Sequence, residues 1–353
     1  MPAPTRRDPL PRQPVGLDWP TAWSRTDPAP DVDSRLLYQA LDRALPSEPE
    51  TAQDLDAELD MTLAVAIAHR GRVVAERYGP TAGPDEPLIS WSMAKSVVHL
   101  WCGLLVADGR LDIDAPAAVA EWAGDERSRI TMGHLLTMTS GLEFCEDYVD
   151  DETSHVIEML FGDGNQDVAA YARSMPLIHE PGTRFNYSSG TTNIIARLCG
   201  DLIGDQASVA GYLQERLFAP LGMTSADLRF DPAGTFIGSS FLYCTTLDFL
   251  RIGYLALRDG VWGGRRLLPA GWIDQARTPV SVEVDEDFWY GTHWWLWGDR
   301  TGAFGAHGYE GQYTIVVPAR DLVVVRLGKT PSDRKAAVTE WIGDMIDCFP
   351  EAP

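Results

Sequence analysis

The chain of 353 residues has only three lysines, Lys95, Lys329 and Lys335, against 26 arginines. Arginine does not release its proton in a protein, whereas a lysine removed from water has a lowered pKa and can serve as a base. Lys95 stands among apolar residues, where a charged side chain is costly. A lysine kept there by a chain that otherwise uses arginine points to a chemical role.

The sequence also lacks the features of membrane proteins and of nucleic-acid-binding proteins. No apolar run approaches the roughly 20 residues of a membrane span, and residues 1–20 carry arginines and prolines without the apolar core of a signal peptide. A formal charge of -22 disfavours nucleic acid and anionic membrane surfaces as partners. We therefore expect a soluble, cytoplasmic protein with no membrane or nucleic-acid partner.

Metal and disulfide patterns are missing as well. The five cysteines are odd in number, widely spaced and without a C-x-x-C pair, which favours reduced thiols in the core. The seven histidines form no H-E-x-x-H motif, so the sequence implies no metal and no cofactor. A G-x-S-x-G motif is absent too, which argues against the nucleophile elbow of α/β-hydrolases.

The stretch 89–98 contains Ser92-Met93-Ala94-Lys95, followed by an apolar stripe with helical spacing that ends near Gly109. In a helix, Ser92 and Lys95 share one face, so the lysine nitrogen can reach the hydroxyl, and the helix N-terminus favours developing negative charge. The alternative is a capping serine and a lysine that extends to solvent. A second S-x-x-K, 332–335, is charged at its central positions and is interpreted as an exposed helix start.

Periodicity and turn residues predict an α+β fold, with an antiparallel sheet built from both ends of the chain, flanking helices and an inserted helical lobe. We expect an extended N-terminal segment at 1–30, an α/β lobe from 31–110 and 260–353, and a mainly helical lobe at 111–259. The expected helices are 33–45, 92–109, 130–142, 165–175, 191–204, 206–218, 246–258 and 334–348. The expected strands are 61–69, 73–78, 288–297, 313–317 and 322–327.

Two further stretches could complete a site around a lysine-activated serine. Tyr187, in the polar turn 185–190, could carry a proton, since a nearby cationic lysine lowers the pKa of a phenol. The glycine-rich segment 305–312 could bring a backbone donor close to an oxyanion. Taken singly, these stretches are better explained as a buried aromatic residue at a helix N-terminus and as a hairpin loop. The tryptophans of 288–297 suggest an aromatic wall, with core packing as the alternative.

Taken together and in this order, the three stretches resemble the serine β-lactamase and penicillin-binding-protein superfamily. In particular they are similar to the branch that holds class C β-lactamases, family VIII-type esterases and 6-aminohexanoate oligomer hydrolases. The resemblance spans about residues 60–348. It includes the stretches 135–142 and 181–190, and less specifically 257–264.

The resemblance implies a role for each matching residue. Ser92 would be the acylated nucleophile, Lys95 its base partner, and Tyr187 the tyrosine of a Y-x-N element. A segment from His307, through Gly308 and Tyr309, would replace the K-T-G strand motif. The backbone N–H of Glu310 would join that of Ser92 in an oxyanion hole.

Two departures weaken the antibiotic-hydrolase interpretation. Ser189 stands where class C β-lactamases carry asparagine, and His307 stands where they carry lysine. Those positions help to hold the β-lactam amide and carboxylate. The loop 146–148 also resembles the mobile tyrosine loop of the 6-aminohexanoate hydrolases, which would place Tyr148 against a substrate amide.

The leading hypothesis is a serine hydrolase that cleaves a small-molecule ester or amide through an acyl-enzyme on Ser92. A β-lactamase or D-Ala-D-Ala peptidase, and a non-catalytic binding protein on the same fold, remain alternatives. A Ser-His-Asp triad with His307 as base requires that its ring reach Ser92 and that an acid support it. The sequence leaves the acyl group, the leaving group and the oligomeric state open.

Overall fold

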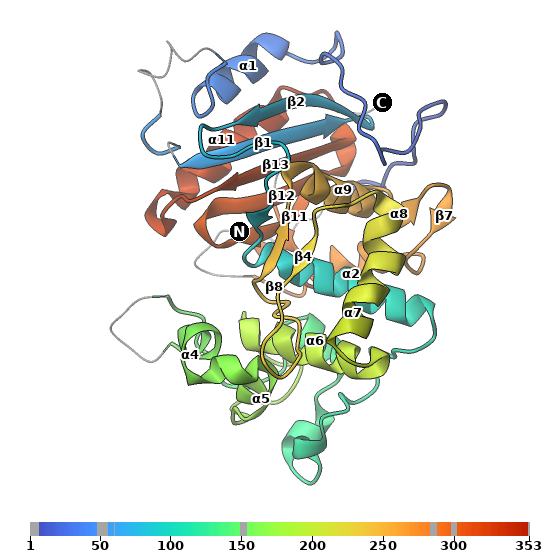
Figure 1. The fold of residues 1–353 in the computed structure, drawn as a ribbon, viewed down its shortest axis with the longest axis vertical. Helices are drawn as coiled ribbons and strands as arrows, with labels where there is room; N and C mark the ends of the chain where they lie inside the picture. The colour runs from blue at the N-terminus through green and yellow to red at the C-terminus, as the bar shows by residue number, and fades with distance from the viewer. Residues whose placement is uncertain are drawn as a thin grey trace.

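The computed structural model describes residues 7–47, 56–59, 61–148, 154–282, 288–297 and 302–351. Within them, a sheet of eight strands has the order β2-β1-β13-β12-β11-β10-β9-β8, and every neighbouring pair is antiparallel. Strands from both ends of the chain meet where β1 pairs with β13, as the sequence predicts (Figure 1). The strands are β1 (Thr62–His69), β2 (Arg72–Tyr78), β8 (Ser281–Val282), β9 (Trp289–Tyr290), β10 (Trp295–Leu296), β11 (Phe304–Gly308), β12 (Gln312–Val317) and β13 (Leu322–Gly328).

Each face of the sheet packs against its own helices, because side chains alternate between the faces of a strand. In β1, Ala64 and Ala66 belong to one core cluster, whereas Val65 and Ile67 belong to the other. Helices α2 (Met93–Ala107) and α9 (Thr246–Leu257) contribute to the first cluster, and α1 (Ser34–Asp42) and α11 (Lys335–Asp347) to the second. Buried on both faces, β1 and β13 are almost continuously apolar.

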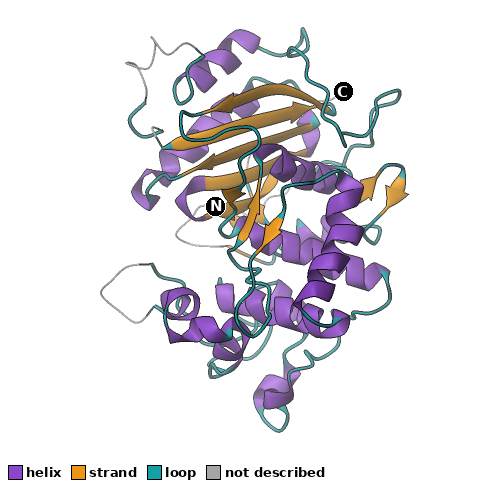
Figure 2. Cartoon of the chain, in the orientation of Figure 1, coloured by secondary structure: helices purple, strands orange, loops and turns teal. Residues whose placement is uncertain are grey.

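The middle of the chain is mainly helical, and Figure 2 shows these helices gathered in the half of the molecule away from the long strands. Helix α2 packs against both β11 and α6, so it runs between the sheet and the helical half. The other helices are α3 (Met132–Leu136), α4 (His155–Phe161), α5 (Val168–Arg173), α6 (Ser189–Ile203), α7 (Gln206–Leu213), α8 (Ala219–Leu221) and α10 (Trp272–Ala276). Short strands β3 (Leu88–Ile89), β4 (Asp227–Leu228) and β5 (Leu242–Cys244) form a small sheet, and β6 (Val261–Trp262) pairs with β7 (Arg265–Arg266).

Most predicted elements are confirmed, with ends that differ by a few residues. Side-chain caps account for several helix starts: Asp33 accepts from the N–H of Leu36, and Thr131 forms a capping box with His134. Helix α3 is shorter than expected, because the backbone at Met138 takes a left-handed conformation with φ 58°.

The prediction of one extended strand over 288–297 is wrong. The segment folds back on itself, and the two-residue strands β9 and β10 pair with each other. His293 lies in the turn between them with φ 57°. Aromatic content does not distinguish one long strand from two short ones, so the composition of this run does not reveal the turn.

The described part of the N-terminal segment lies along α9. The hydroxyl of Tyr254 donates to Gln13, and Arg251 and Arg258 donate to the carbonyl oxygens of Thr21 and Pro11. The boundaries of the expected lobes stay a prediction. Helix α9, which that division places in the helical lobe, packs against β1, β12 and β13.

All five cysteines are free thiols, and Cys102 and Cys199 face each other in the core with their sulfurs 3.6 Å apart. No helix in the described ranges combines the length and the hydropathy needed to cross a membrane. Groups of three or more potential metal ligands are absent from the same ranges.

A glycine-to-alanine change should have opposite effects on stability at two helical positions, one at the contact between α9 and the sheet and one on the exposed surface of α7. A Cβ at Gly253 would lie 2.6 Å from Val323 Cγ1 and 2.8 Å from Thr314 Cγ2, both on strands packed on two sides. We expect Gly253→Ala to destabilise the protein by about 1 to 3 kcal/mol, because the helix and the sheet must separate. Exposed Gly211 in α7 has no atom within 4 Å of such a Cβ, so Gly211→Ala should stabilise by about 0.5 to 1 kcal/mol. Thermal unfolding of both variants checks this, and equal midpoints would contradict the tight packing.

Candidate active site

Ser92 is the N-cap of α2 and lies at the point where the short strand β3 turns into this helix. The preceding residue, Trp91, has φ 43°, a conformation rare for a bulky side chain and often found at functional sites. Buried Ser90 ties the turn to the chain before β5: its hydroxyl donates to the Ser240 carbonyl at 3.2 Å and accepts from the N–H of Leu242 at 3.3 Å. The position of Ser92 is therefore determined by a locked strand-to-helix turn.

The Lys95 side chain returns to Ser92 one turn earlier on the same helix. Its Nζ donates to Ser92 Oγ at 2.8 Å, to Ser189 Oγ at 2.9 Å and to the Ser239 carbonyl at 3.1 Å. Only 2% of the Lys95 side chain is exposed, and the Ser92 hydroxyl makes no capping bond. The alternative of a capping serine and a solvent-directed lysine is therefore wrong.

The environment of Lys95 changes its charge state. Burial lowers the pKa of its amine to about 8, although the Glu146 carboxylate opposes this shift. The Glu146 oxygen lies 4.0 Å from Lys95 Nζ. A substantial neutral fraction at mildly alkaline pH gives the amine a lone pair with which to take a proton.

Tyr187 lies on the other side of this amine. The centre of its ring is 4.8 Å from Lys95 Nζ, and the ring packs against Trp295 at 5.2 Å and Tyr290 at 5.8 Å between centroids. The polar turn before α6 carries Tyr187, and Ser189 is the first residue of α6; both reach the face of α2 where Lys95 lies. The structure thus brings together Ser92, Lys95 and Tyr187, which are distant in sequence.

The turn Tyr309–Gly311 follows β11 and approaches the start of α2. Gly308 lies so close to this segment that a Cβ would be 2.4 Å from the Ser90 carbonyl oxygen. Glu310 has φ 59°, and its carboxylate accepts a hydrogen bond from the Trp91 indole at 3.0 Å. This hydrogen bond links Trp91 and Glu310, which both have left-handed backbone and lie on opposite sides of the site.

Buried Arg326 of β13 supports the same turn from behind. Its guanidinium donates to the carbonyl oxygens of Glu310 at 3.0 Å and Gly311 at 2.8 Å, and to the hydroxyls of Thr62 and Thr330. Burial lowers the pKa of Arg326 to about 10, so the group remains a cation at neutral pH. The charged guanidinium of Arg326 therefore holds the turn, and neutral carbonyl and hydroxyl oxygens accept the hydrogen bonds that it donates.

His307 is buried in β11 among aromatic rings. It stacks on Trp295, with centroids 5.5 Å apart, and its Nε2 accepts a hydrogen bond from the Trp297 indole at 2.8 Å. Burial lowers the pKa of His307 well below its usual value, and its Nδ1 has no partner among the described residues. The Ser-His-Asp alternative is not supported, because Nε2, the nitrogen that would face Ser92, accepts from the Trp297 indole instead.

Aromatic side chains surround the outer edge of the site. Tyr148 stacks on Tyr309 with centroids 4.7 Å apart, and Tyr309 contacts Trp91 edge-on at 5.6 Å. Burial, with Glu146 nearby, raises the pKa of Tyr148, so its hydroxyl keeps its proton. The predicted loop tyrosine therefore lies beside the other candidate residues.

Comparison with known proteins identifies the family. The model of the family described as Beta-lactamase matches residues 53–343. The chain belongs to this family. It is 28% identical over 332 residues to the 6-aminohexanoate-dimer hydrolase of Paenarthrobacter ureafaciens, covering 88% of this chain and 82% of that protein.

Solved structures agree on the fold. A Bacillus anthracis protein with a provisional assignment as a 6-aminohexanoate-dimer hydrolase aligns with a TM-score of 0.75 and 21% identity, covering 98% of this chain and 90% of that one. A family VIII carboxylesterase aligns with a TM-score of 0.64 and 15% identity, covering 92% and 99%. The predicted β-lactamase/transpeptidase-like fold is confirmed, and family membership makes the protein a serine hydrolase.

Three residues beside Lys95 were not among the candidates drawn from the sequence. Glu146 stood in the predicted tyrosine loop without a role, and Ser239 belongs to a buried serine pair that carries no motif. His293 donates from Nδ1 to the Leu136 carbonyl and accepts from Thr192, while burial lowers its pKa to about 3. A neutral histidine with both nitrogens occupied supports the packing around this β-lactamase-family site.

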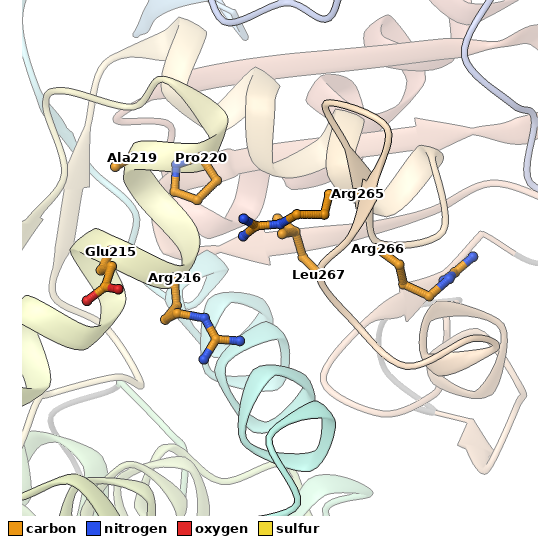
Figure 3. Close-up of a pocket in the computed structure, with 7 residues that line it drawn as sticks. All are labelled: Glu215, Arg216, Ala219, Pro220, Arg265, Arg266 and Leu267. Carbon is orange, nitrogen blue, oxygen red and sulfur yellow. The ribbon is translucent and has the colours of Figure 1, made fainter.

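A pocket of about 660 Å³ lies elsewhere, between α8 and the β6–β7 hairpin (Figure 3). Two of its arginines are paired: Arg216 with Asp108, and Arg266 with Asp259. Asp108 is the C-cap of α2, so this pocket lies at the opposite end of the helix from Ser92. Arg216 and Arg266 are thus engaged in ion pairs, and the pocket lies apart from Ser92.

Because the chain has only three lysines, the state of Lys95 can be measured directly. With ¹³Cε-labelled lysine, the NMR spectrum should contain a signal that titrates near pH 8, the pKa of the buried amine. This signal should be absent from a Lys95→Met variant. A Lys95 signal that titrates without a downward shift would contradict the buried environment.

Proposed function

We propose that the protein hydrolyses a small ester or linear amide through an acyl-enzyme on Ser92. The observation that carries this proposal is the 2.8 Å hydrogen bond between Lys95 Nζ and Ser92 Oγ inside the core. A buried amine with a lowered pKa can accept the hydroxyl proton, which a solvated lysine at neutral pH cannot.

The mechanism follows from the positions of the side chains. Neutral Lys95 takes the proton of Ser92 as Oγ attacks the substrate carbonyl carbon. The oxyanion receives hydrogen bonds from the backbone N–H groups of Ser92 and Glu310. Tyr187, next to the newly formed ammonium, passes its phenol proton to the leaving group and takes a proton from Lys95 in return, which leaves the amine neutral again. A water molecule then hydrolyses the ester on Ser92 and restores the enzyme.

The surroundings of the site favour linear esters and amides over β-lactams. His307 is neutral and buried, so it offers no cation to the carboxylate of a β-lactam. Tyr148 and Tyr309 add an aromatic edge against which an acyl or amine group can pack. The names of the similar proteins, an amide hydrolase and a carboxylesterase, support the same substrate class.

A fluorophosphonate probe tests the nucleophile. We expect one adduct, on Ser92, that is lost in Ser92→Ala and forms slowly in Lys95→Met. Its rate should rise as the pH rises through about 8, because the neutral amine is the reactive form. Mass spectrometry of the modified peptide locates the adduct.

Ser332→Ala provides the matched control, since it alters the second S-x-x-K, which is an exposed helix start. Labelling at another serine, or none, would contradict the proposal. The substrate class is measured in parallel with p-nitrophenyl esters, a short linear amide and nitrocefin. Faster turnover of nitrocefin than of the esters and the amide would favour a β-lactamase instead.

The hydrogen bond between Trp91 and Glu310 should matter for the oxyanion hole rather than for binding. Trp91→Phe keeps an aromatic ring but removes the N–H that holds the Glu310 turn. We expect kcat to fall by roughly three- to ten-fold with little change in KM, because the donor is needed in the transition state. Steady-state ester hydrolysis measures this split.

Trp289→Phe is the control for Trp91→Phe. The Trp289 indole N–H has no hydrogen-bond partner among the described residues, so its removal breaks no such bond. An equal loss of kcat in both variants would contradict the specific role of the bond between Trp91 and Glu310.

A further inference from the structure

Glu146 ties the loop after Leu142 to the start of α6. Its Oε2 accepts the backbone N–H of Ser189 at 2.7 Å, and its Oε1 accepts the Ser189 hydroxyl at 2.5 Å. The same Oε1 lies 4.0 Å from Lys95 Nζ, and the Glu146 side chain is only 14% exposed. The carboxylate therefore interacts with Lys95 in two ways: directly through its charge, and indirectly through the hydrogen bonds of Ser189.

These contacts determine which way the Ser189 hydroxyl points. A serine hydroxyl has one proton, which can rotate, and two lone pairs. Since the proton is donated to Glu146, a lone pair of Ser189 Oγ is directed to Lys95 Nζ at 2.9 Å. An asparagine at this position would offer a fixed carbonyl acceptor, whereas a serine needs a partner to set its direction.

We propose that Glu146 is a positioning residue for the acylation step: it orients the Ser189 hydroxyl as an acceptor for Lys95 and supplies the counter-charge to the ammonium that Lys95 becomes. This inference rests on the proposed function and adds a residue to it.

The proton transfer creates charge where water is scarce. The O–H bond of Ser92 breaks, an N–H bond forms on Lys95, and the oxygen electrons form the bond to the carbonyl carbon. The resulting ammonium has three N–H groups, and three acceptors surround it: Ser92 Oγ, Ser189 Oγ and the Ser239 carbonyl. With 2% of the side chain exposed, a nearby carboxylate stabilises this cation more than it would in water.

The other titratable groups near Lys95 do not replace Glu146. His293 stays neutral, because burial lowers its pKa to about 3. Tyr148 keeps its proton, because burial raises its pKa. Tyr187 presents its ring to the amine. Among the described residues, Glu146 is the carboxylate within ion-pair distance of Lys95.

Glu146→Gln tests this role, because it removes the charge and keeps the size of the side chain. The midpoint of the Lys95 titration should move to lower pH by about one unit, since the opposite charge that is removed favours the ammonium at this distance. The fall of kcat/KM on the acid side of its pH profile should move with it. The plateau of kcat should fall by roughly ten- to hundred-fold, as part of the general-base contribution is lost. Rates with a p-nitrophenyl ester give the pH profile, and ¹³Cε-lysine NMR gives the midpoint.

Glu143→Gln is the matched control. Glu143 lies in the same loop and is exposed, so its change alters the net charge equally without touching Lys95. We expect this variant to keep the wild-type midpoint and plateau. A Glu146→Gln enzyme with the same midpoint and plateau as Glu143→Gln would overturn the proposal and leave Glu146 as an anchor of the loop.

Ser189→Ala provides a second test if Glu146→Gln does not fold. It removes the connecting hydroxyl and leaves the carboxylate, so the plateau should fall while the Lys95 midpoint moves less than in Glu146→Gln. An unchanged plateau would overturn the proposal. The NMR titration measures the midpoint of Lys95 without substrate turnover. If this midpoint shifts in Glu146→Gln but Ser92 of the wild-type protein is not acylated, the proposed hydrolase mechanism is wrong and the coupling between Glu146 and Lys95 stands.

Discussion

The burial of one amine is the constraint on which this site depends. Lys95 lies on a helix that packs against the sheet on one side and against α6 on the other, so its nitrogen cannot reach water. A buried ammonium is tolerated only when oxygens surround it, and Ser92, Ser189 and Ser239 supply them from three separate segments. The environment that keeps part of the lysine neutral at moderate pH is therefore the one that brings the serines together.

The sheet contributes the opposite side of the site through a turn with unusual support. Glu310 takes a left-handed backbone, and such a conformation persists only where the surroundings enforce it. Arg326 binds two carbonyl oxygens of the turn from behind, and the Trp91 indole binds the Glu310 side chain from the front. The Glu310 N–H, proposed as an oxyanion donor, would need little reorganisation when held in this way.

The two departures from the class C pattern follow from the same surroundings. At 307, a ring enclosed by Trp295, Trp297 and Tyr313 must be neutral, and histidine can be neutral where lysine would be costly. At 189, serine accepts from Lys95 because a carboxylate takes its proton. The site therefore places the carboxylate of Glu146 within 4.0 Å of the lysine nitrogen.

The sequence by itself determined the periodic features and the local chemistry. The S-x-x-K stretch, the apolar stripe after Val97, and the hairpins that contain β1 and β13 depend on neighbours a few residues apart, so spacing alone predicted them. The family resemblance then assigned roles to Tyr187 and to the backbone N–H of Glu310. The prediction for the aromatic segment 288–297 is wrong, because composition does not reveal where a strand turns back.

Only the tertiary structure decided the electrostatics of the site. Glu146 lies 43 positions before Ser189 in the sequence, and Ser239 lies 144 positions after Lys95, so no local pattern connects them. Their contacts arise where the helical half closes over α2, and the pKa of Lys95 depends on how deeply that closure buries the amine. Burial and long-range charge are properties of the packed chain, and for that reason sequence spacing carries no record of them.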